Sequence, residues 1–273
     1  MKKRRADERL YEEMNLESLA LARALIMEGR AFAGERKLKS PGEMVSEKEI
    51  MRVRGALDRY VSRGAHKLKK ALEVFSLDVR GAVCVDVGAS TGGFTDVLLR
   101  AGAKHVYAVD VGYNLLDYRL RSDARVTAME RVNARFLRAE DFPERPSFGA
   151  TDVSFISLKA VLPAVLSVLD GPDRRFVALV KPQFEAARED VGEKGVVRDP
   201  QVHQRVLEEI TSFVPTLGWR CAGLDFSPIR GPEGNIEFLL YIVPGDAGAE
   251  TLHEYAISDT IRRAYDKFIK MPE

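Results

Sequence analysis

The feature that most constrains the fold is an alternation of apolar strand-like segments and helix-like segments that starts near residue 82. Such alternation is typical of a mostly parallel sheet covered by helices on both faces. The fold class predicted is therefore α/β. The helix-like segments lie near residues 93–101, 114–121, 157–169 and 201–217, and the strand-like segments cover residues 83–87, 105–109, 125–129, 148–153, 176–180, 219–226 and 236–243.

The last two strand-like segments are too close together for a helix to connect them. About ten residues lie between them, whereas a crossover between parallel strands needs roughly a dozen or more. We therefore expect these two strands to pair antiparallel, and a charged segment at residues 250–270 to close the chain as a helix. Seven strands with one antiparallel strand near the end are typical of the Rossmann-like sheet of methyltransferases.

Residues 5–54 form a smaller unit with a pattern of its own. Apolar spacing predicts a helix over residues 16–27, and Gly29 supplies its stop signal. Short strand-like pieces follow at residues 30–33 and 44–45. The side chains expected on the buried stripe of the helix are Leu16, Leu19, Ala20, Ala24 and Met27.

Charge is distributed unevenly along the chain. Residues 1–70 hold 18 Lys and Arg against 11 Asp and Glu, a net charge of +7, whereas residues 71–273 hold 24 against 30, a net charge of −6. A basic N-terminal part on an acidic body favours contact with a polyanion. The alternative is a basic surface that only faces solvent.

A glycine-rich turn follows the first strand of the sheet and precedes a helix, in residues 83–95. Glycines let the backbone turn tightly and approach a ligand closely, which puts the ligand at the carboxyl end of the strands. Asp110, 22 residues beyond Gly88, ends the next strand and is placed to hold a ribose diol. Asn133 follows the third strand, where it either contacts an adenine or caps its own backbone. The predicted cofactor-binding residues are Asp86, Gly88, Ser90, Gly92, Phe94, Asp110 and Asn133.

A dinucleotide is the competing ligand for such a turn. The spacing here is Gly-x-x-x-Gly-Gly, not the Gly-x-Gly-x-x-Gly that admits a pyrophosphate, and Asp86 would repel phosphates. S-adenosylmethionine has no phosphate and carries positive charges that suit a carboxylate. The turn therefore favours S-adenosylmethionine, with a purely structural glycine turn as the remaining alternative.

Four charged residues stand at positions that a sheet does not need for its packing: Lys67, Asp152, Lys181 and Glu237. Asp152 and Lys181 end strands, and strand ends in an open α/β sheet converge on the ligand crevice. A ribose hydroxyl is a weak acid that must be aligned and deprotonated before it can accept a methyl group. We expect a lysine to take this proton, with its pKa lowered by a second lysine and by burial. Asp152 and Glu237 would orient the two lysines.

The order of these residues relative to the glycine-rich turn resembles the FtsJ-type ribose 2′-O-methyltransferases. Longer stretches resemble the TlyA family, also called haemolysin A: residues 86–95, 107–113, 152–157, 180–185, 195–200 and 231–238. The resemblance implies a Rossmann-fold methyltransferase domain over residues 61–273. It also implies that S-adenosyl-L-methionine is the methyl donor, that cytidine ribose in ribosomal RNA of the ribosomal subunits is the substrate, and that the four charged residues form the catalytic tetrad.

The N-terminal pattern resembles the RNA-binding domain of the ribosomal small-subunit protein S-four, through residues 5–7, 22–30 and 39–42. The resemblance implies an α+β RNA-binding domain and linker over residues 1–60. The polar loop at residues 183–200 is expected to cover the site and to contact RNA as well. The basic residues predicted to contact RNA are Arg5, Arg23, Arg30, Lys37, Lys39, Arg63 and Arg198.

Other classes of protein are less consistent with the sequence. Cys84 and Cys221 are expected to be inert core thiols, and neither they nor the four histidines show metal-ligand spacing, so no metal site is expected. No apolar run is long enough for a membrane helix, and a cytoplasmic location is expected. A non-catalytic RNA-binding protein with this fold remains an alternative, as does a membrane-active haemolysin. The sequence does not fix the oligomeric state.

Overall fold

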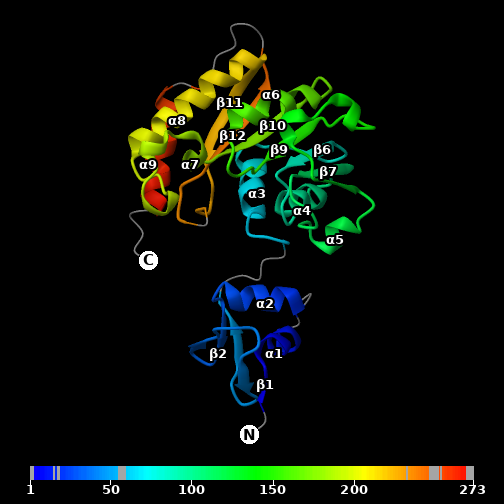
Figure 1. The fold of residues 1–273 in the computed structure, drawn as a ribbon, viewed down its shortest axis with the longest axis vertical. Coiled ribbons are helices and arrows are strands. Elements are labelled where there is room, and N and C mark those ends of the chain that lie inside the picture. The colour runs from blue at the N-terminus through cyan, green and yellow to red at the C-terminus, as the bar shows by residue number, and fades with distance from the viewer. Residues whose placement is uncertain are drawn as a thin grey trace. The chain divides into compact units, whose positions relative to one another are not determined.

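The chain divides into two compact units, Met1–Arg59 and Tyr60–Glu273, which are taken separately below (Figure 1). A computed structural model describes residues 3–14, 16, 19–54, 60–231, 233–245, 252 and 254–268.

The smaller unit combines two helices with short antiparallel strands. Strand β1 pairs with β4, and β2 lies between β3 and β5. Helix α1 was not predicted from the sequence. The elements are β1 (Lys3–Arg5), α1 (Ala6–Glu13), α2 (Leu19–Met27), β2 (Ala31–Ala33), β3 (Arg36–Lys37), β4 (Met44–Ser46) and β5 (Met51–Val53).

Helix α2 buries a different face from the one predicted. Ala22, Leu25 and Ile26 are buried in the core of this unit, whereas Met27 is 71% exposed. The predicted stripe was therefore wrong, except for Leu16 before the helix, which is buried. The buried face is the one that packs with α1 and the strands, and the sequence spacing allowed either face. Gly29 ends the helix with a φ of +69°, as predicted.

The larger unit is built on a seven-stranded sheet of order β11-β12-β10-β9-β6-β7-β8. All neighbouring pairs are parallel except those that involve β12, which runs antiparallel to both β10 and β11. The predicted α/β fold class, the seven strands and the antiparallel final pair are confirmed. The strands are β6 (Val83–Val87), β7 (His105–Asp110), β8 (Val126–Glu130), β9 (Phe148–Thr151), β10 (Arg175–Val180), β11 (Trp219–Phe226) and β12 (Phe238–Pro244).

Helices cover both faces of this sheet because successive strand residues point to opposite sides. Val83, Val85 and Val87 of β6 face the core beneath α6, α8 and α9, whereas Cys84 faces the core beneath α3, α4 and α5 (Figure 1). The sequence did not predict α3. The helices are α3 (Ala65–Val74), α4 (Gly93–Arg100), α5 (Tyr118–Arg121), α6 (Leu158–Val168), α7 (Pro182–Glu185), α8 (Pro200–Phe213) and α9 (Glu254–Phe268).

Helix α5 is shorter than the predicted segment of residues 114–121. Asn114 has a φ of +57°, which an α-helix does not allow. The Asp117 side chain accepts a hydrogen bond from the Arg119 backbone N–H and caps the helix there. The helix therefore starts at Tyr118.

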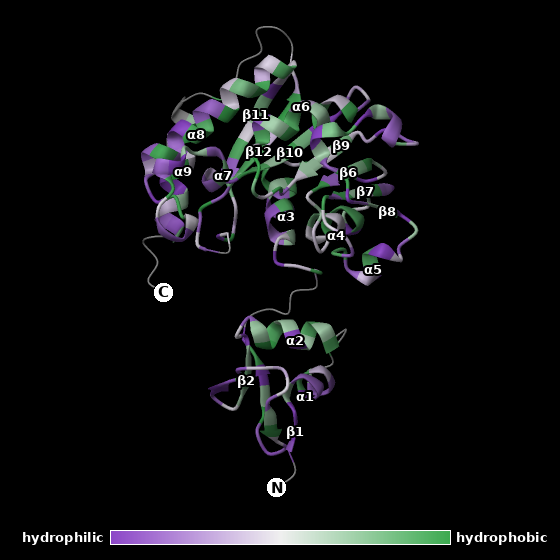
Figure 2. Ribbon diagram, in the orientation of Figure 1, coloured by the Kyte–Doolittle hydropathy of each residue, from purple (hydrophilic) through white to green (hydrophobic). Residues whose placement is uncertain are grey.

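Apolar residues concentrate in the strands and on the inner faces of the helices (Figure 2). Cys84 and Cys221 are buried there, and burial raises the pKa of each thiol to about 12, as expected for inert core cysteines. Over the part of the chain that the structure describes, every helix is too short or too polar to cross a membrane.

Candidate active site

The sheet topology brings the four charged residues together. Asp152 directly follows β9 and Lys181 directly follows β10, so both lie at the carboxyl edge of these parallel neighbours. Glu237 precedes β12, which runs antiparallel to β10 and therefore starts at the same edge. Lys67 comes from the first turn of α3.

The four side chains form an unbranched chain of ion pairs. Glu237 Oε2 lies 2.8 Å from Lys67 Nζ, and Lys67 Nζ lies 3.1 Å from Asp152 Oδ2. Asp152 Oδ1 lies 2.6 Å from Lys181 Nζ, which also donates a hydrogen bond of 2.8 Å to Ser154 Oγ. Both lysines are only 7% exposed and Glu237 is 1% exposed. Because these charges are buried, loss of Lys67 would leave Glu237 without a partner among the four, and loss of Asp152 would leave Lys181 without one.

The pKa values of this chain of ion pairs depart from the sequence-based expectation. Burial lowers the pKa of Lys67, but Asp152 and Glu237 outweigh burial and hold that pKa above its usual value. The expectation of a lowered pKa was therefore wrong for Lys67, because the carboxylates dominate. Burial raises the pKa of Asp152, but Lys67 and Lys181 bring it below its usual value. Burial raises the pKa of Glu237 in spite of Lys67.

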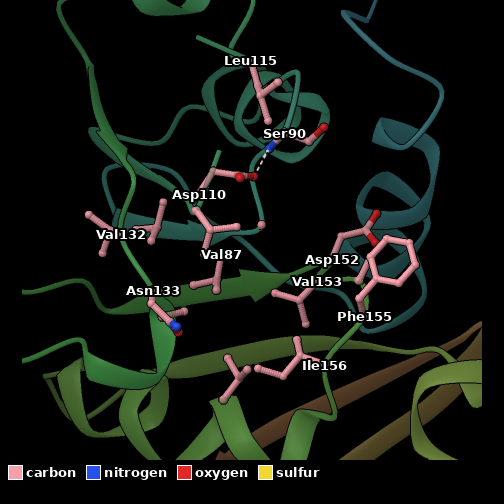
Figure 3. Close-up of a pocket in the computed structure, with 16 residues that line it drawn as sticks. Val87, Ser90, Asp110, Leu115, Val132, Asn133, Asp152, Val153, Phe155 and Ile156 are labelled. Atoms are coloured by element: carbon pink, nitrogen blue, oxygen red, sulfur yellow. Dashed lines mark hydrogen bonds between the residues drawn. The ribbon is translucent and has the colours of Figure 1, made fainter. Parts of the chain in front are cut away.

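A cavity of about 460 Å³ lies beside these residues, at the carboxyl ends of β6, β7 and β9 (Figure 3). Asp110 and Asn133 line it together with the apolar side chains of Val111, Leu115 and Ile156. Asn133 also caps a short 3-10 helix by accepting a hydrogen bond of 3.1 Å from the Arg135 N–H, which is the backbone-capping role predicted for it. The volume lies within the range of pockets for small ligands and cofactors.

The glycine-rich turn packs closely against the backbone just after β9, the strand that pairs with β6. Gly88 has a φ of +82°, and a Cβ there would lie 3.0 Å from the Asp152 carbonyl oxygen. The Ser90 N–H donates to Asp110 Oδ2 at 2.8 Å (Figure 3), and the Gly112 N–H donates to Asp110 Oδ1 at 2.7 Å. These bonds fix the Asp110 carboxylate at the wall of the cavity, where each oxygen keeps a lone pair for a ligand hydroxyl.

Asp86 and Gly92 line neither this cavity nor a smaller one beside it that contains Lys67 and Lys181. Asp86 is fully buried, and its Oδ2 accepts from Thr95 N at 2.8 Å and from Thr95 Oγ1 at 2.7 Å. Its Oδ1 has no hydrogen-bond partner among the described residues, and burial raises its pKa to about 7. Gly92 is the N-cap of α4, with a φ of +97°. Phe94 is buried and lines a smaller cavity.

The charges around the larger cavity suit a cationic ligand. Asp110 and Asp152 line the cavity, and both carboxylates act to raise the pKa of Asp86, so the three lie near one another. Among the described residues that line it, none is Lys or Arg. A pyrophosphate would therefore meet carboxylates without a compensating cation, whereas a sulfonium or ammonium group would be stabilised.

The smaller cavity, of about 230 Å³, is lined by the four members of the ion-pair chain. Lys67, Lys181 and Glu237 line it, and Asp152 and Ser154 line both cavities. A donor in the larger cavity and an acceptor in the smaller one would therefore meet beside Lys181.

Two residues of the site were not singled out from the sequence. Ser154 accepts the hydrogen bond from Lys181 described above. Phe155 is 90% exposed with a φ of +63°, and its ring centroid lies 5.0 Å from that of Phe184. Because the phenyl group remains largely exposed even beside Phe184, packing does not explain its left-handed backbone conformation. This favours a role in binding. The sequence signal was a large aromatic residue three positions after Asp152, the polar residue that follows β9.

The predicted RNA-contacting residues lie on the surface of both units. In the smaller unit, Arg5 Nη2 and Arg23 Nε lie 2.8 and 2.9 Å from Oδ2 of Asp7. Arg30 donates to the Arg54 carbonyl at 3.2 Å. Arg63 and Arg198 of the larger unit are exposed, and so are Lys37 and Lys39 of the smaller unit.

The loop of residues 183–200 is more ordered than its polar composition suggested. It contains short helical turns, and Val196 and Val197 are buried. Asn235 holds it, since its Oδ1 accepts from Val197 N at 3.0 Å and its Nδ2 donates to the Gly195 carbonyl at 2.9 Å. The Arg198 carbonyl accepts a hydrogen bond of 2.6 Å from the Tyr265 hydroxyl of α9.

Known proteins are similar to this chain in sequence and fold. The FtsJ-like methyltransferase family matches residues 60–243. The 16S/23S rRNA (cytidine-2'-O)-methyltransferase TlyA of Mycobacterium tuberculosis is 43% identical over 239 residues, which cover 87% of this chain and 89% of that protein. Hemolysin A of Brachyspira hyodysenteriae is 40% identical over 240 residues, which cover 88% of this chain and 99% of that protein. The solved structure of a candidate hemolysin from Streptococcus thermophilus has a TM-score of 0.79 at 44% identity, and the match covers 99% of this chain and 98% of that chain.

Proposed function

Because the chain belongs to the FtsJ-like methyltransferase family, we propose that it transfers a methyl group from S-adenosylmethionine to ribose 2′-hydroxyls of ribosomal RNA. Cytidine is the proposed target nucleotide, since relatives at 43% and 34% identity are named as rRNA cytidine-2'-O-methyltransferases. We propose that the protein methylates this RNA within ribosomal subunits, in the cytoplasm.

One observation carries this proposal. A buried chain of ion pairs, Glu237–Lys67–Asp152–Lys181, lies beside a cavity that is lined by carboxylates and not by Lys or Arg among the described residues. A buried lysine that a carboxylate holds in place can be oriented toward a hydroxyl to exchange a proton with it, and the cavity is suited to a cationic cofactor without phosphates.

We propose different tasks for the two lysines. Lys67 has a carboxylate on either side, which keeps it charged, so it holds Asp152 and Glu237 in place. Lys181 faces one carboxylate and one neutral hydroxyl, that of Ser154. We assign the contact with the ribose 2′-hydroxyl to Lys181, which in its uncharged amine form would accept the hydroxyl proton.

Bound S-adenosylmethionine supplies a methyl group made electrophilic by the positive charge on its sulfur. Asp110 would hold the ribose hydroxyls of this cofactor, and Asn133 with Val111, Leu115 and Ile156 would surround its adenine. The alignment of the target hydroxyl with the methyl group accounts for much of the acceleration, because an oriented pair reacts as if it were one molecule.

RNA would reach the site along basic side chains. We propose that Arg63 and Arg198 of the larger unit contact phosphates near the target nucleotide. In the smaller unit we propose the same role for Arg5, Arg23, Arg30, Lys37 and Lys39.

The test combines cofactor binding with mapping of the product. Isothermal titration calorimetry should detect S-adenosylmethionine, and Asp110→Ala should weaken it by about 1 to 3 kcal/mol, the range for removal of hydrogen bonds to a charged group. Incubation with labelled S-adenosylmethionine and separate ribosomal subunits should place the label on a cytidine 2′-oxygen. Label on a base, or binding of NAD without binding of S-adenosylmethionine, would contradict the proposal.

A further inference from the structure

A second hollow lies where β10 begins, at the end of this strand that is opposite to the active site. Its volume is about 450 Å³, similar to that of the cofactor cavity, and Arg174, Arg175, Arg220 and Tyr241 line it with Asp173. Strand β10 has six residues, and at roughly 3.3 Å per residue this hollow lies about 20 Å from Lys181 at the other end of the strand. It is therefore separate from the active site. We call it the basic hollow.

The charge of the basic hollow favours an anion. Three guanidinium groups, those of Arg174, Arg175 and Arg220, line it against the single carboxylate of Asp173. All three arginines are partly buried, whereas Asp173 is exposed to solvent and so is better screened. The planar guanidinium fork binds the oxygens of phosphate in pairs, which makes arginine the residue suited to phosphate recognition.

Two of the arginines are held in place before any ligand arrives. The guanidinium carbon of Arg174 lies 5.4 Å from the Trp219 ring centroid, and its Nη1 donates to the Gly171 carbonyl at 3.0 Å. Arg175 Nη2 donates to the Asp78 carbonyl at 2.9 Å. Side chains that are already ordered lose little entropy when a ligand binds, so the basic hollow is preorganised.

Polar groups of the basic hollow lack partners within the described part of the chain. The Arg175 Nε is buried and has no hydrogen-bond partner there. The Arg220 guanidinium and the Tyr241 hydroxyl likewise have no hydrogen bond or ion pair with a described residue. Burial raises the pKa of Tyr241 while Arg175 and Arg220 act to lower it, so both guanidinium groups lie near this hydroxyl. A buried donor without a partner costs free energy, which a bound anion would recover.

We propose that the basic hollow binds closely spaced phosphate groups. Arg175 and Arg220 would contact the phosphate oxygens, Tyr241 would donate its hydroxyl hydrogen, and Arg174 would add charge from its position on Trp219. Two sources share this chemistry: the polyphosphate of a free nucleotide, and the phosphodiester backbone of an RNA strand that extends beyond its target nucleotide.

The test uses the tryptophan beside the basic hollow. The chain has one tryptophan, Trp219, which contacts Arg174, so intrinsic fluorescence of the full-length protein reports on this hollow. Inorganic pyrophosphate, ADP and a short RNA are titrated in separate experiments. We expect saturable binding that Arg220→Gln weakens about tenfold, as expected for loss of a charge-assisted hydrogen bond. Arg125→Gln is the matched control, since Arg125 pairs with Asp123 beside β8 at the far end of the sheet.

Each outcome decides between these possibilities. Weaker pyrophosphate and ADP binding in Arg220→Gln supports a nucleotide site, and weaker binding of RNA alone supports a contact with the RNA backbone. Equal affinities for Arg220→Gln and Arg125→Gln with every probe, or no saturable binding, would overturn the proposal. Calorimetry with Arg175→Gln repeats the test without fluorescence, and unchanged S-adenosylmethionine binding verifies that each variant is folded. Methyl transfer is not measured, so the result does not depend on the proposed function.

Discussion

The buried charges of the active site are linked so closely that the two lysines should respond differently to substitution. Lys181→Met leaves Asp152 paired with Lys67, whereas Lys67→Met leaves Glu237 without any partner among the four. We expect Lys67→Met to lower the free energy of unfolding by about 3 to 5 kcal/mol, the cost of a buried charge without compensation. Lys181→Met should lower it less. Urea denaturation of both variants measures the difference.

Both substitutions should nevertheless abolish most of the methyl transfer. Each should reduce single-turnover methylation of a ribosomal subunit by about a hundredfold or more, the usual contribution of acid–base groups. The double variant should lose much less than the product of the two single losses, because the residues act as one unit. Near-normal methylation by Lys181→Met would exclude it as the proton acceptor.

Phe155 combines an unfavourable backbone conformation with an exposed ring, which suggests that it stacks on a nucleobase. Phe155→Ala should weaken RNA binding by about 1 to 3 kcal/mol, the range for loss of base stacking. Phe155→Gly should bind RNA as weakly as Phe155→Ala but be about 1 kcal/mol more stable, because glycine adopts a positive φ without strain. Binding assays and urea denaturation separate the two effects. Unchanged RNA affinity in Phe155→Ala would leave the exposed ring unexplained.

At the scale of secondary structure elements, the strands were predictable because their apolar runs are nearly continuous, as in sheets buried on both faces. The predicted tetrad followed from the same strands, since Asp152 and Lys181 stand at their ends. Helix α3 was missed because its buried residues, Ala65, Leu68 and Ala71, are interleaved with lysines. The exposed ring of Phe155 depends on one backbone angle, which no spacing of residues reveals.

The packing of α8 and α9 against β12 should make stability sensitive to acid. His203 of α8 is fully buried against Phe238 of β12, and its Nδ1 lies 3.0 Å from the Tyr265 hydroxyl of α9. Burial lowers its pKa to about 4, from 6.5 in the unfolded chain. Because the unfolded state binds the proton more tightly, stability is unaffected by His203 above the unfolded pKa and falls as the pH drops from there toward the folded pKa.

We expect this proton uptake to cost about 2 to 3 kcal/mol between about pH 7.5 and about pH 4.5. His203→Gln has no proton to gain, so its free energy of unfolding should fall by that much less over the same range. Urea denaturation of the two proteins at both pH values gives the comparison. Parallel losses in acid would mean that His203 is not the group that titrates.

At the scale of the whole molecule, the two units have separate cores, so cofactor binding and RNA binding should be separable. Deletion of residues 1–54 removes the core that contains Leu10, Leu25 and Ile26 but none of the residues that surround the sheet. The truncated protein should bind S-adenosylmethionine with unchanged affinity. Its RNA affinity should fall, and its salt dependence should become shallower by roughly 0.7 to 0.9 for each phosphate that it no longer neutralises. Binding assays at several salt concentrations measure this slope, and an unchanged slope would assign the smaller unit to another partner.

The neutrality of the buried ion-pair chain has a kinetic consequence. Its two lysines and two carboxylates cancel, so the groups assigned to the reaction exert little long-range attraction on a polyanion. Attraction at a distance must come from the basic side chains at the surface, whose fields are screened within about 8 Å by physiological salt. Ionic strength would then govern how often the two molecules collide productively, while the turnover of a complex already formed stays nearly constant.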